Sequence, residues 1–188
     1  MKKRFFSLLI GNKGSVFIEA AFIFTFLSIL TVGLLEYGTL LVLKSQVERV
    51  NYSIASVIRE RSELYSKNDA FTTSEMKEIY ELTKALTYHR YDKELCIRIE
   101  SVHFKAQQKK VISHQQSENY GSSLCNKLNT TPISKKIEFS PLSSRNRWLP
   151  MYQVSLIIPT PAGSLNKLLK KVDALPETVS AHTLMLVR

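Results

Sequence analysis

An uncharged apolar run close to the N-terminus constrains this chain more than any other feature. The run from Ala20 to Leu35 holds sixteen residues without an ionisable side chain and is rich in Phe, Leu and Ile. With residues 15–18 added on the other side of Glu19, about 20 residues can form a helix of about 30 Å, the thickness of a bilayer's hydrocarbon core. We therefore expect a transmembrane helix over residues 15–43.

A basic leader, residues 1–14, precedes this helix. It contains four cations and no acid, which favours a cytoplasmic leader and an exported remainder, periplasmic in a bacterium. The cations are Lys2, Lys3, Arg4 and Lys13. A secretory signal has its cleavage site beyond the apolar region, but here the small residues Gly14 and Ser15 lie before the run. Cleavage there would leave the helix on the mature protein, whereas an uncleaved chain would be a single-span membrane-anchored periplasmic domain.

Two acids flank the uncharged run. A carboxylate in hydrocarbon is costly unless it is paired or lies near the interface, so Glu19 is either solvated by headgroups or neutralised by a partner. Glu36, followed by Tyr37, lies where the helix should leave the bilayer, and this pair suits that interface.

The helix is expected to continue as an amphipathic segment over residues 44–65. Apolar residues recur there at three- and four-residue steps, which is the pattern of a helix that packs one stripe on a core. The expected stripe consists of Val47, Val50, Ile54, Val57, Ile58, Arg61 and Leu64. Residues 66–188 then provide 123 residues, enough for one exported domain with its own core.

The exported domain is expected to mix helices and strands. A helix over residues 74–89, capped by Thr73 or Ser74, is expected first. A change to period-two alternation at residues 95–104 then predicts a half-buried strand. The other expectations are a polar surface loop over 105–134 with at most a short strand at 110–113, strands at 136–139, 153–158 and 182–187, and a short helix at 164–172. The predicted fold is therefore α+β, with a long N-terminal helix packed on a small antiparallel sheet and one or two further helices.

The two cysteines, Cys96 and Cys125, are 29 positions apart and have no accompanying histidine or cysteine cluster. Zinc ligation is therefore not expected, nor any other metal site or cofactor. In an oxidising compartment two such cysteines usually pair, and the bond would stabilise the fold by about 3–4 kcal/mol. Two free thiols in a cytosolic protein are the alternative, but the expected export favours the disulfide.

No catalytic motif is present, so we expect no enzyme. The four histidines are scattered, and the chain lacks a glycine-rich phosphate loop. Nucleic-acid binding by the membrane-anchored protein is a second alternative, because cations lie beside aromatic residues in two places. These are Lys105, Lys109 and Lys110 near Phe104, and Arg145 and Arg147 near Trp148. Removal of the leader would lower the formal net charge from +10 to +6. A charge of +6 spread over the chain is weak evidence for binding to nucleic acid.

The stretch Gly14-Ser15-Val16-Phe17-Ile18-Glu19 and the helix after it resemble the type IV prepilins. The stretch from Gly14 to Phe22 narrows the resemblance to the TadE/TadF pilin-like proteins (pseudopilins) of tight-adherence systems. The chain's size, its C-terminal strand run and its 147–154 segment, Arg-Trp-Leu-Pro-Met-Tyr-Gln-Val, look most like TadF. The resemblance implies cleavage after Gly14 by a prepilin peptidase, with the new α-amine of Ser15 in one subunit neutralising Glu19 of a neighbour.

The same resemblance implies a minor subunit that supports assembly of the Flp pilus, a type IVb pilus used for adherence and biofilm formation. Its implied partners are the prepilin peptidase, TadE-like and Flp pilin subunits, the inner-membrane platform and membrane lipid. It also implies a cysteine near the end of the 152–156 run, where this chain has Ile157, so that Cys96 and Cys125 are left as the one intramolecular pair.

Overall fold

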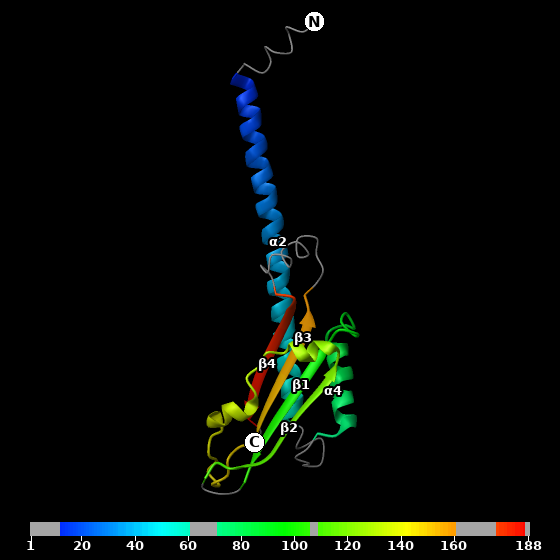
Figure 1. Cartoon of the computed structure of the whole chain (residues 1–188), viewed down its shortest axis with the longest axis vertical. Helices are drawn as coiled ribbons and strands as arrows, with labels where there is room; N and C mark the ends of the chain where they lie inside the picture. Colours follow the sequence, from blue (N-terminus) through cyan, green and yellow to red (C-terminus); the bar gives the residue numbers. More distant parts are fainter. Residues whose placement is uncertain (1–11, 61–70, 106–108, 161–175, 187–188) are drawn as a thin grey trace.

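A computed structural model describes residues 12–60, 71–105, 109–160 and 176–186. In chain order the elements are α2 (Asn12–Arg59), α4 (Thr73–Leu86), β1 (Cys96–Phe104), β2 (Ile112–Gly121), the 3-10 helices η1 (Ser123–Lys127) and η2 (Ile133–Phe139), β3 (Met151–Pro159) and β4 (Thr178–Leu186). Figure 1 shows that the first part of α2 projects far beyond the remaining elements, whereas its second part lies against the sheet. The expected α+β class is confirmed.

The four strands form one antiparallel sheet in the order β2-β1-β3-β4. β1 and β3 are central, and nearly every residue of these two strands is buried. β2 and β4 are the edges. β1 and β2 are joined as a hairpin whose register shifts at His103, which pairs with His114, while Phe104 pairs with Ile112. The shift indicates a bulge, which increases the local twist of the hairpin.

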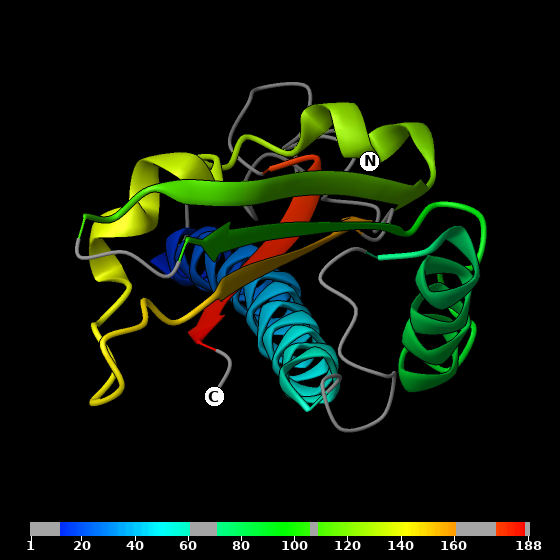
Figure 2. The ribbon, with the colours of Figure 1, turned by 90° about the horizontal axis from the view of Figure 1, so that it is seen from below.

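The second part of α2 packs on one face of the sheet, with α4 beside it (Figure 2). The α2 residues that enter the core are Leu43, Val47, Ile54, Ala55 and Ile58. They recur at helical spacing, and each large aliphatic side chain among them contributes roughly 1.5–3 kcal/mol by its burial. The expected stripe is wrong at Val57, which is 37% exposed. Its last two members, Arg61 and Leu64, lie outside the described residues.

The opposite face of the sheet is covered by η1, η2 and the segments around them (Figure 2). The expectation that β1 is a half-buried strand is therefore wrong. Glu100 is 5% exposed, because the chain after β2 folds back over this face and fastens to it. Period-two alternation shows which side chains share a face, but not whether a later segment covers that face.

α4 begins one residue before the expected start and ends three residues before the expected end. Its N-cap is Thr72, whose side chain accepts a hydrogen bond from the backbone N–H of Glu75 while the Glu75 carboxylate accepts one from the N–H of Thr72. This reciprocal capping box satisfies two helix-end donors. At the other end, the backbone N–H groups of Tyr88 and His89 turn back to Ala85 and Lys84, which stops the helix at Leu86.

Two further expectations for the polar middle of the chain are wrong. Residues 112–121 form a full strand rather than a loop with a short strand, and residues 133–139 form a 3-10 helix rather than a strand. β2 shows almost no alternation of apolar and polar residues. As an edge strand it is held by its backbone hydrogen bonds to β1, so its side chains do not have to be buried. The strands expected at 153–158 and 182–187 are present, the latter beginning earlier, at Thr178. The short helix expected at 164–172 lies outside the described residues.

Candidate assembly helix and its supporting domain

The first part of α2 is an apolar surface that its own fold leaves uncovered. Every described side chain from Val16 to Leu35 is exposed, including Phe17 at 77% and Phe24 at 74%. Within the described residues this is the one helix long and apolar enough to cross a membrane, with a mean hydropathy of 2.2 over its best window and none of that window buried. Such a surface needs lipid or other helices around it.

The hydroxyl groups on this segment are satisfied within the helix. Thr25, Ser28 and Thr31 each donate to the backbone carbonyl four residues earlier, at 2.8 Å. These bonds remove the need for water at the side chains, so the hydroxyls are compatible with a hydrocarbon environment. The three hydroxyl groups therefore do not prevent this segment from lying in an apolar environment.

Glu19 lies on the exposed side-chain surface of this helix, with apolar neighbours along the chain on both sides. A carboxylate in such a position can pair with a cation brought by another molecule, as an ammonium group would be. The backbone at Gly14 and Ser15 belongs to α2, and the description of side chains begins at Val16. The processing role of Gly14 and Ser15 and the assembly role of Glu19 stay predictions.

The environment of α2 changes over the residues that follow the apolar run. Glu36 is half-buried and Tyr37 is 55% exposed, while Leu43 is 6% exposed and belongs to the domain's core. The helix therefore passes from a fully exposed segment to a packed one within about two turns. The expected boundary between the membrane span and the amphipathic continuation, at residues 43 and 44, stays a prediction.

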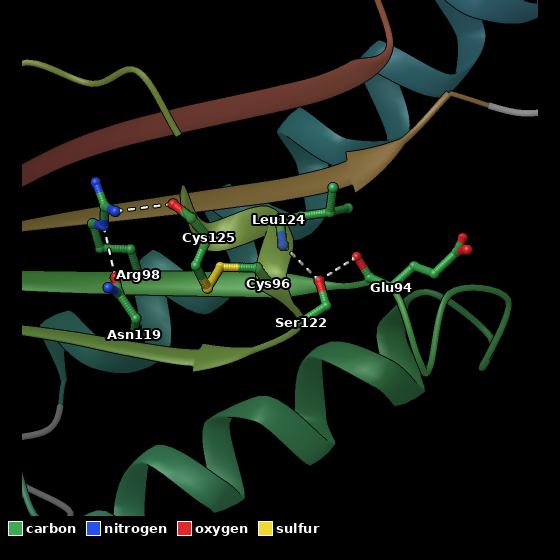
Figure 3. The surroundings of a disulfide bond; sticks show 7 residues. All are labelled: Glu94, Cys96, Arg98, Asn119, Ser122, Leu124 and Cys125. Carbon is green, nitrogen blue, oxygen red and sulfur yellow. Dashed lines mark hydrogen bonds between the residues drawn. A yellow bond between two sulfur atoms is a disulfide. The ribbon is translucent and has the colours of Figure 1, made fainter. Parts of the chain in front are cut away.

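A disulfide bond joins Cys96, the first residue of β1, to Cys125 in η1 (Figure 3). Their Cα atoms are 5.4 Å apart. Ile157, at the position where the resemblance implies a cysteine, lies opposite Cys96 on β3 and packs in the same small cluster as the two sulfurs. The bond thus fixes η1 on the outer face of the sheet.

Hydrogen bonds hold the same segment from both sides of the disulfide (Figure 3). The Arg98 guanidinium donates to the backbone carbonyl of Cys125 at 3.0 Å and to the Asn119 side-chain oxygen at 2.7 Å. The Ser122 hydroxyl donates to the carbonyl of Glu94 and accepts from the N–H of Leu124. These contacts are structural, because each one joins groups of the fold to one another.

A buried polar network lies further along the same face, where the sequence indicated only solvent-exposed charge. Gln153 donates to the Glu100 carboxylate at 2.9 Å and to the carbonyl of Thr131 at 3.3 Å, and it accepts from the Lys136 ammonium at 2.8 Å. Burial raises the pKa of Glu100, while Arg98, the Ile133 N–H and Lys136 act in the opposite direction. The network holds the chain around η2 on the sheet. The glutamine inside the largely apolar 151–158 run was the one signal that could have revealed this network.

The cations considered for nucleic acid are in part used inside the fold. The Lys110 ammonium donates to the carbonyls of Ile137, Glu138 and Ser140 at 2.8–3.2 Å and lies 4.3 Å from the centre of the Trp148 ring. All three of its donors are satisfied, so it is not available to a phosphate. No group of three metal-ligating side chains occurs among the residues that the structure describes.

The comparisons with known proteins give one family. No curated protein and no solved structure matches the chain. The family TadF, described as "Putative tight adherence pilin protein F", matches residues 7–188, which include the apolar helix, both cysteines and all four strands. This chain therefore belongs to the TadF family of tight adherence pilin proteins.

Proposed function

We propose that this chain is a minor pilin-like subunit that supports assembly of a tight-adherence Flp pilus, for adherence and biofilm formation. The observation that carries the proposal is the exposed apolar part of α2 with Glu19 near its N-terminal end. A helix that its own domain leaves uncovered can be held by lipid before assembly and by neighbouring helices afterwards. The family of the chain supports the same interpretation.

In the proposed sequence of events, a prepilin peptidase cuts the inner-membrane protein after Gly14 and removes the cytoplasmic leader. The α-amine of Ser15 in one subunit then pairs with Glu19 of a neighbouring TadE-like, TadF-like or Flp pilin subunit. Pairing with a charged amine lowers the cost of holding a carboxylate in an apolar environment, so the free energy of that charge favours association. Residues 15–43 would span the membrane, while residues 44–65 and 66–188 would lie in the periplasm and contact the assembly platform.

Mass spectrometry of the membrane-extracted protein tests the processing step. In cells with the complete secretion locus, the parent protein should begin at Ser15, whereas Gly14→Leu should keep the intact Met1 terminus, because a bulky side chain at the cleavage position excludes the peptidase. Gly11→Leu is the matched control, since it makes the same change three residues upstream and should leave cleavage unaffected. A parent protein that retains Met1 in these cells would contradict the proposal.

A further inference from the structure

β4 is an edge strand without the features that usually protect an edge. Its residues, Thr178–Leu186, pair with β3 in an uninterrupted register and include no acid, lysine, arginine or proline. Among the described residues, no strand lies on its other side. Folded proteins commonly blunt such an edge with a charge, a proline or a bulge, because its free N–H and C=O groups can pair with another chain.

The opposite edge of the same sheet, β2, does carry such features. It contains Glu118, most of its side chains are exposed, and its pairing with β1 is interrupted by the bulge next to His103. β4 instead ends in the apolar run Leu184 to Leu186, whose side chains are half-buried. One edge of the sheet is therefore suited to solvent, whereas the other is suited to a further strand.

A groove lies along β4 on its α2 side. It consists of two hollows of about 440 and 790 Å³, which adjoin because both are lined by Tyr52 and Thr183. Together they follow β4 from Ser180 to Leu186. At about 3.3 Å per residue this stretch is about 20 Å long, the length of an extended segment of about six residues.

The smaller hollow reaches around the edge of the sheet. Tyr52 lies on α2, which packs on one face, and Phe139 ends η2, which covers the opposite face, yet both line this hollow together with the end of β4. The two side chains are 65% and 69% exposed. Two aromatic rings thus border an edge strand in solvent, and such rings often anchor a protein interface.

The charge of the groove favours an acidic partner. The described residues that line the two hollows include three cations and one acid. They are Lys44, Arg49, Arg59 and Glu48. Because β4 itself adds no acid, the excess of positive charge favours a segment with acidic side chains over a neutral or basic one.

A second copy of the chain does not suit this edge. Two copies would bring the same excess of positive charge together. Antiparallel pairing of two β4 strands would also reverse the direction of one α2, because α2 lies roughly along β4 (Figure 1) and a two-fold axis would relate the copies. The two helices could not then enter one membrane from the same side, a step that rests on the membrane insertion in the proposed function.

We infer that the free edge of β4 binds an extended, acidic segment of another protein as an additional strand. Backbone hydrogen bonds to alternate residues of β4 supply the affinity. An apolar side chain of the segment enters the hollow between Tyr52 and Phe139, and an acidic side chain pairs with Arg59. The proposed function uses the apolar part of α2 for assembly, so this edge is a second and separate contact surface.

Hydrogen exchange of the full-length protein in detergent tests this inference. The probe is a synthetic peptide of about eight residues, in which leucine alternates with threonine and an aspartate stands at each end. It should slow amide exchange in residues 180–186 and leave β2 unchanged. The control peptide has proline at its centre, which interrupts a strand ladder, and should protect neither edge. No protection of β4 at millimolar peptide, or equal protection by the two peptides, would overturn the inference.

Substitutions in the groove separate specific binding from general stickiness. Tyr52→Ala with Phe139→Ala should weaken binding of the probe about tenfold, because both aromatic walls are lost. Tyr88→Ala with Leu82→Ala removes two exposed apolar side chains outside the groove and should leave binding unchanged. Slow exchange of β1 and β3 verifies in the same measurement that each variant is folded. Equal weakening by the two pairs would overturn the inference.

Arg59→Gln tests the charge contact. It should weaken binding of the aspartate peptide but not of the same peptide with asparagine at both ends, because only the first carries carboxylates. Equal losses for the two peptides would refute the acidic character of the partner.

A series of protein concentrations without peptide distinguishes a second copy. If protection of β4 rises with the concentration of the protein itself, the edge pairs between copies and the inference is wrong. None of these measurements needs the secretion locus. A failure here therefore leaves the processing test untouched, and a protein that keeps Met1 can still bind the peptide.

Discussion

The side-chain amide of Asn51 on α2 donates to the Thr183 hydroxyl on β4 at 2.8 Å, across 132 positions of the sequence. The same amide lies 3.3 Å from the carbonyl of Val154 on β3, and Asn51 is completely buried. Aliphatic side chains on a helix can slide against a sheet at small cost, whereas the NH2 group of Asn51 reaches both of its acceptors in one position only. The Asn51–Thr183 bond therefore fixes the register of α2 on the domain.

Asn51→Ala should lower the free energy of unfolding by about 1–3 kcal/mol, because it leaves Thr183 and the strand carbonyl without this donor. Unfolding of the full chain in detergent micelles, followed by the fluorescence of its single tryptophan, measures the change. Ser53→Ala is the control, since that exposed hydroxyl bonds only to the Arg49 carbonyl within the helix and should change little. A double-mutant cycle with Thr183→Val should show a coupling energy; additive effects would contradict the register role.

Glu100 should make stability fall as pH rises. Burial raises the pKa of its carboxyl above the ordinary value of 4.5, so the folded protein holds this proton more tightly than the unfolded chain does. The stabilisation that comes from the protonated Glu100 carboxyl is complete below pH 4.5. It is lost as pH rises through the pKa of this carboxyl in the folded protein.

Glu100→Gln should abolish this part of the pH dependence, because glutamine stays neutral and can still accept from Gln153. Burial lowers the pKa of His182 below 6.5, with Lys136 and Arg98 acting in the same direction, so the His182 contribution is lost as pH falls below 6.5. The His182 contribution therefore makes stability rise with pH, opposite to the Glu100 contribution. Because the variant and the parent both contain His182, subtracting their free energies of unfolding at each pH removes the His182 contribution. Glu138→Gln, at an exposed carboxyl, should follow the parent, and an unchanged slope in Glu100→Gln would refute the assignment.

Replacing Cys96 and Cys125 together by alanine should lower the free energy of unfolding by about 3–4 kcal/mol, as expected for a loop of this length. A reductant should destabilise the parent by a similar amount and leave the double variant unchanged. Equilibrium denaturation with and without reductant measures both effects. If the reductant leaves the parent's midpoint where it was, the bond does not contribute to stability as described.

Lys110→Met should loosen the end of η2, because the ammonium that satisfies three carbonyls and stacks on Trp148 is removed. We expect a loss of about 1.5–3 kcal/mol, the range for hydrogen bonds to a charged group, together with a shift in tryptophan emission. Lys109→Met is the matched control at the exposed neighbour. Identical emission from the two variants would show that Lys110 does not set the environment of Trp148.

Glu19→Ala should permit membrane insertion but impair pilus assembly, because removing the carboxylate removes the proposed partner of a neighbour's α-amine. The protein should remain in the membrane fraction while the number of surface pili falls. Glu48→Ala, an exposed acid further along α2, serves as the control and should leave piliation intact. Normal piliation in Glu19→Ala would remove the assembly role.

The elements predicted well were those with a strong local pattern. The apolar run of α2, the alternation in β1 and the apolar stretch in β3 depend on neighbouring residues, so the sequence reveals them without knowledge of the partners of each element. β2 was missed because an edge strand made of Gln, Ser and His is held by its pairing with β1 rather than by burial. η2 was mistaken for a strand because a short apolar and charged alternation does not distinguish the two.

Three features of this protein can be predicted from its sequence. They are a helix that only an apolar environment can accept, an acid near the N-terminal end of that helix, and a domain attached beyond it. These follow from composition over consecutive residues, because the transfer of side chains and backbone into hydrocarbon is a local property. Only the tertiary fold buries Glu100 and brings Asn51 to Thr183. Such contacts join residues far apart in the chain, and their energies exist only once the fold has brought both partners out of water to the same place.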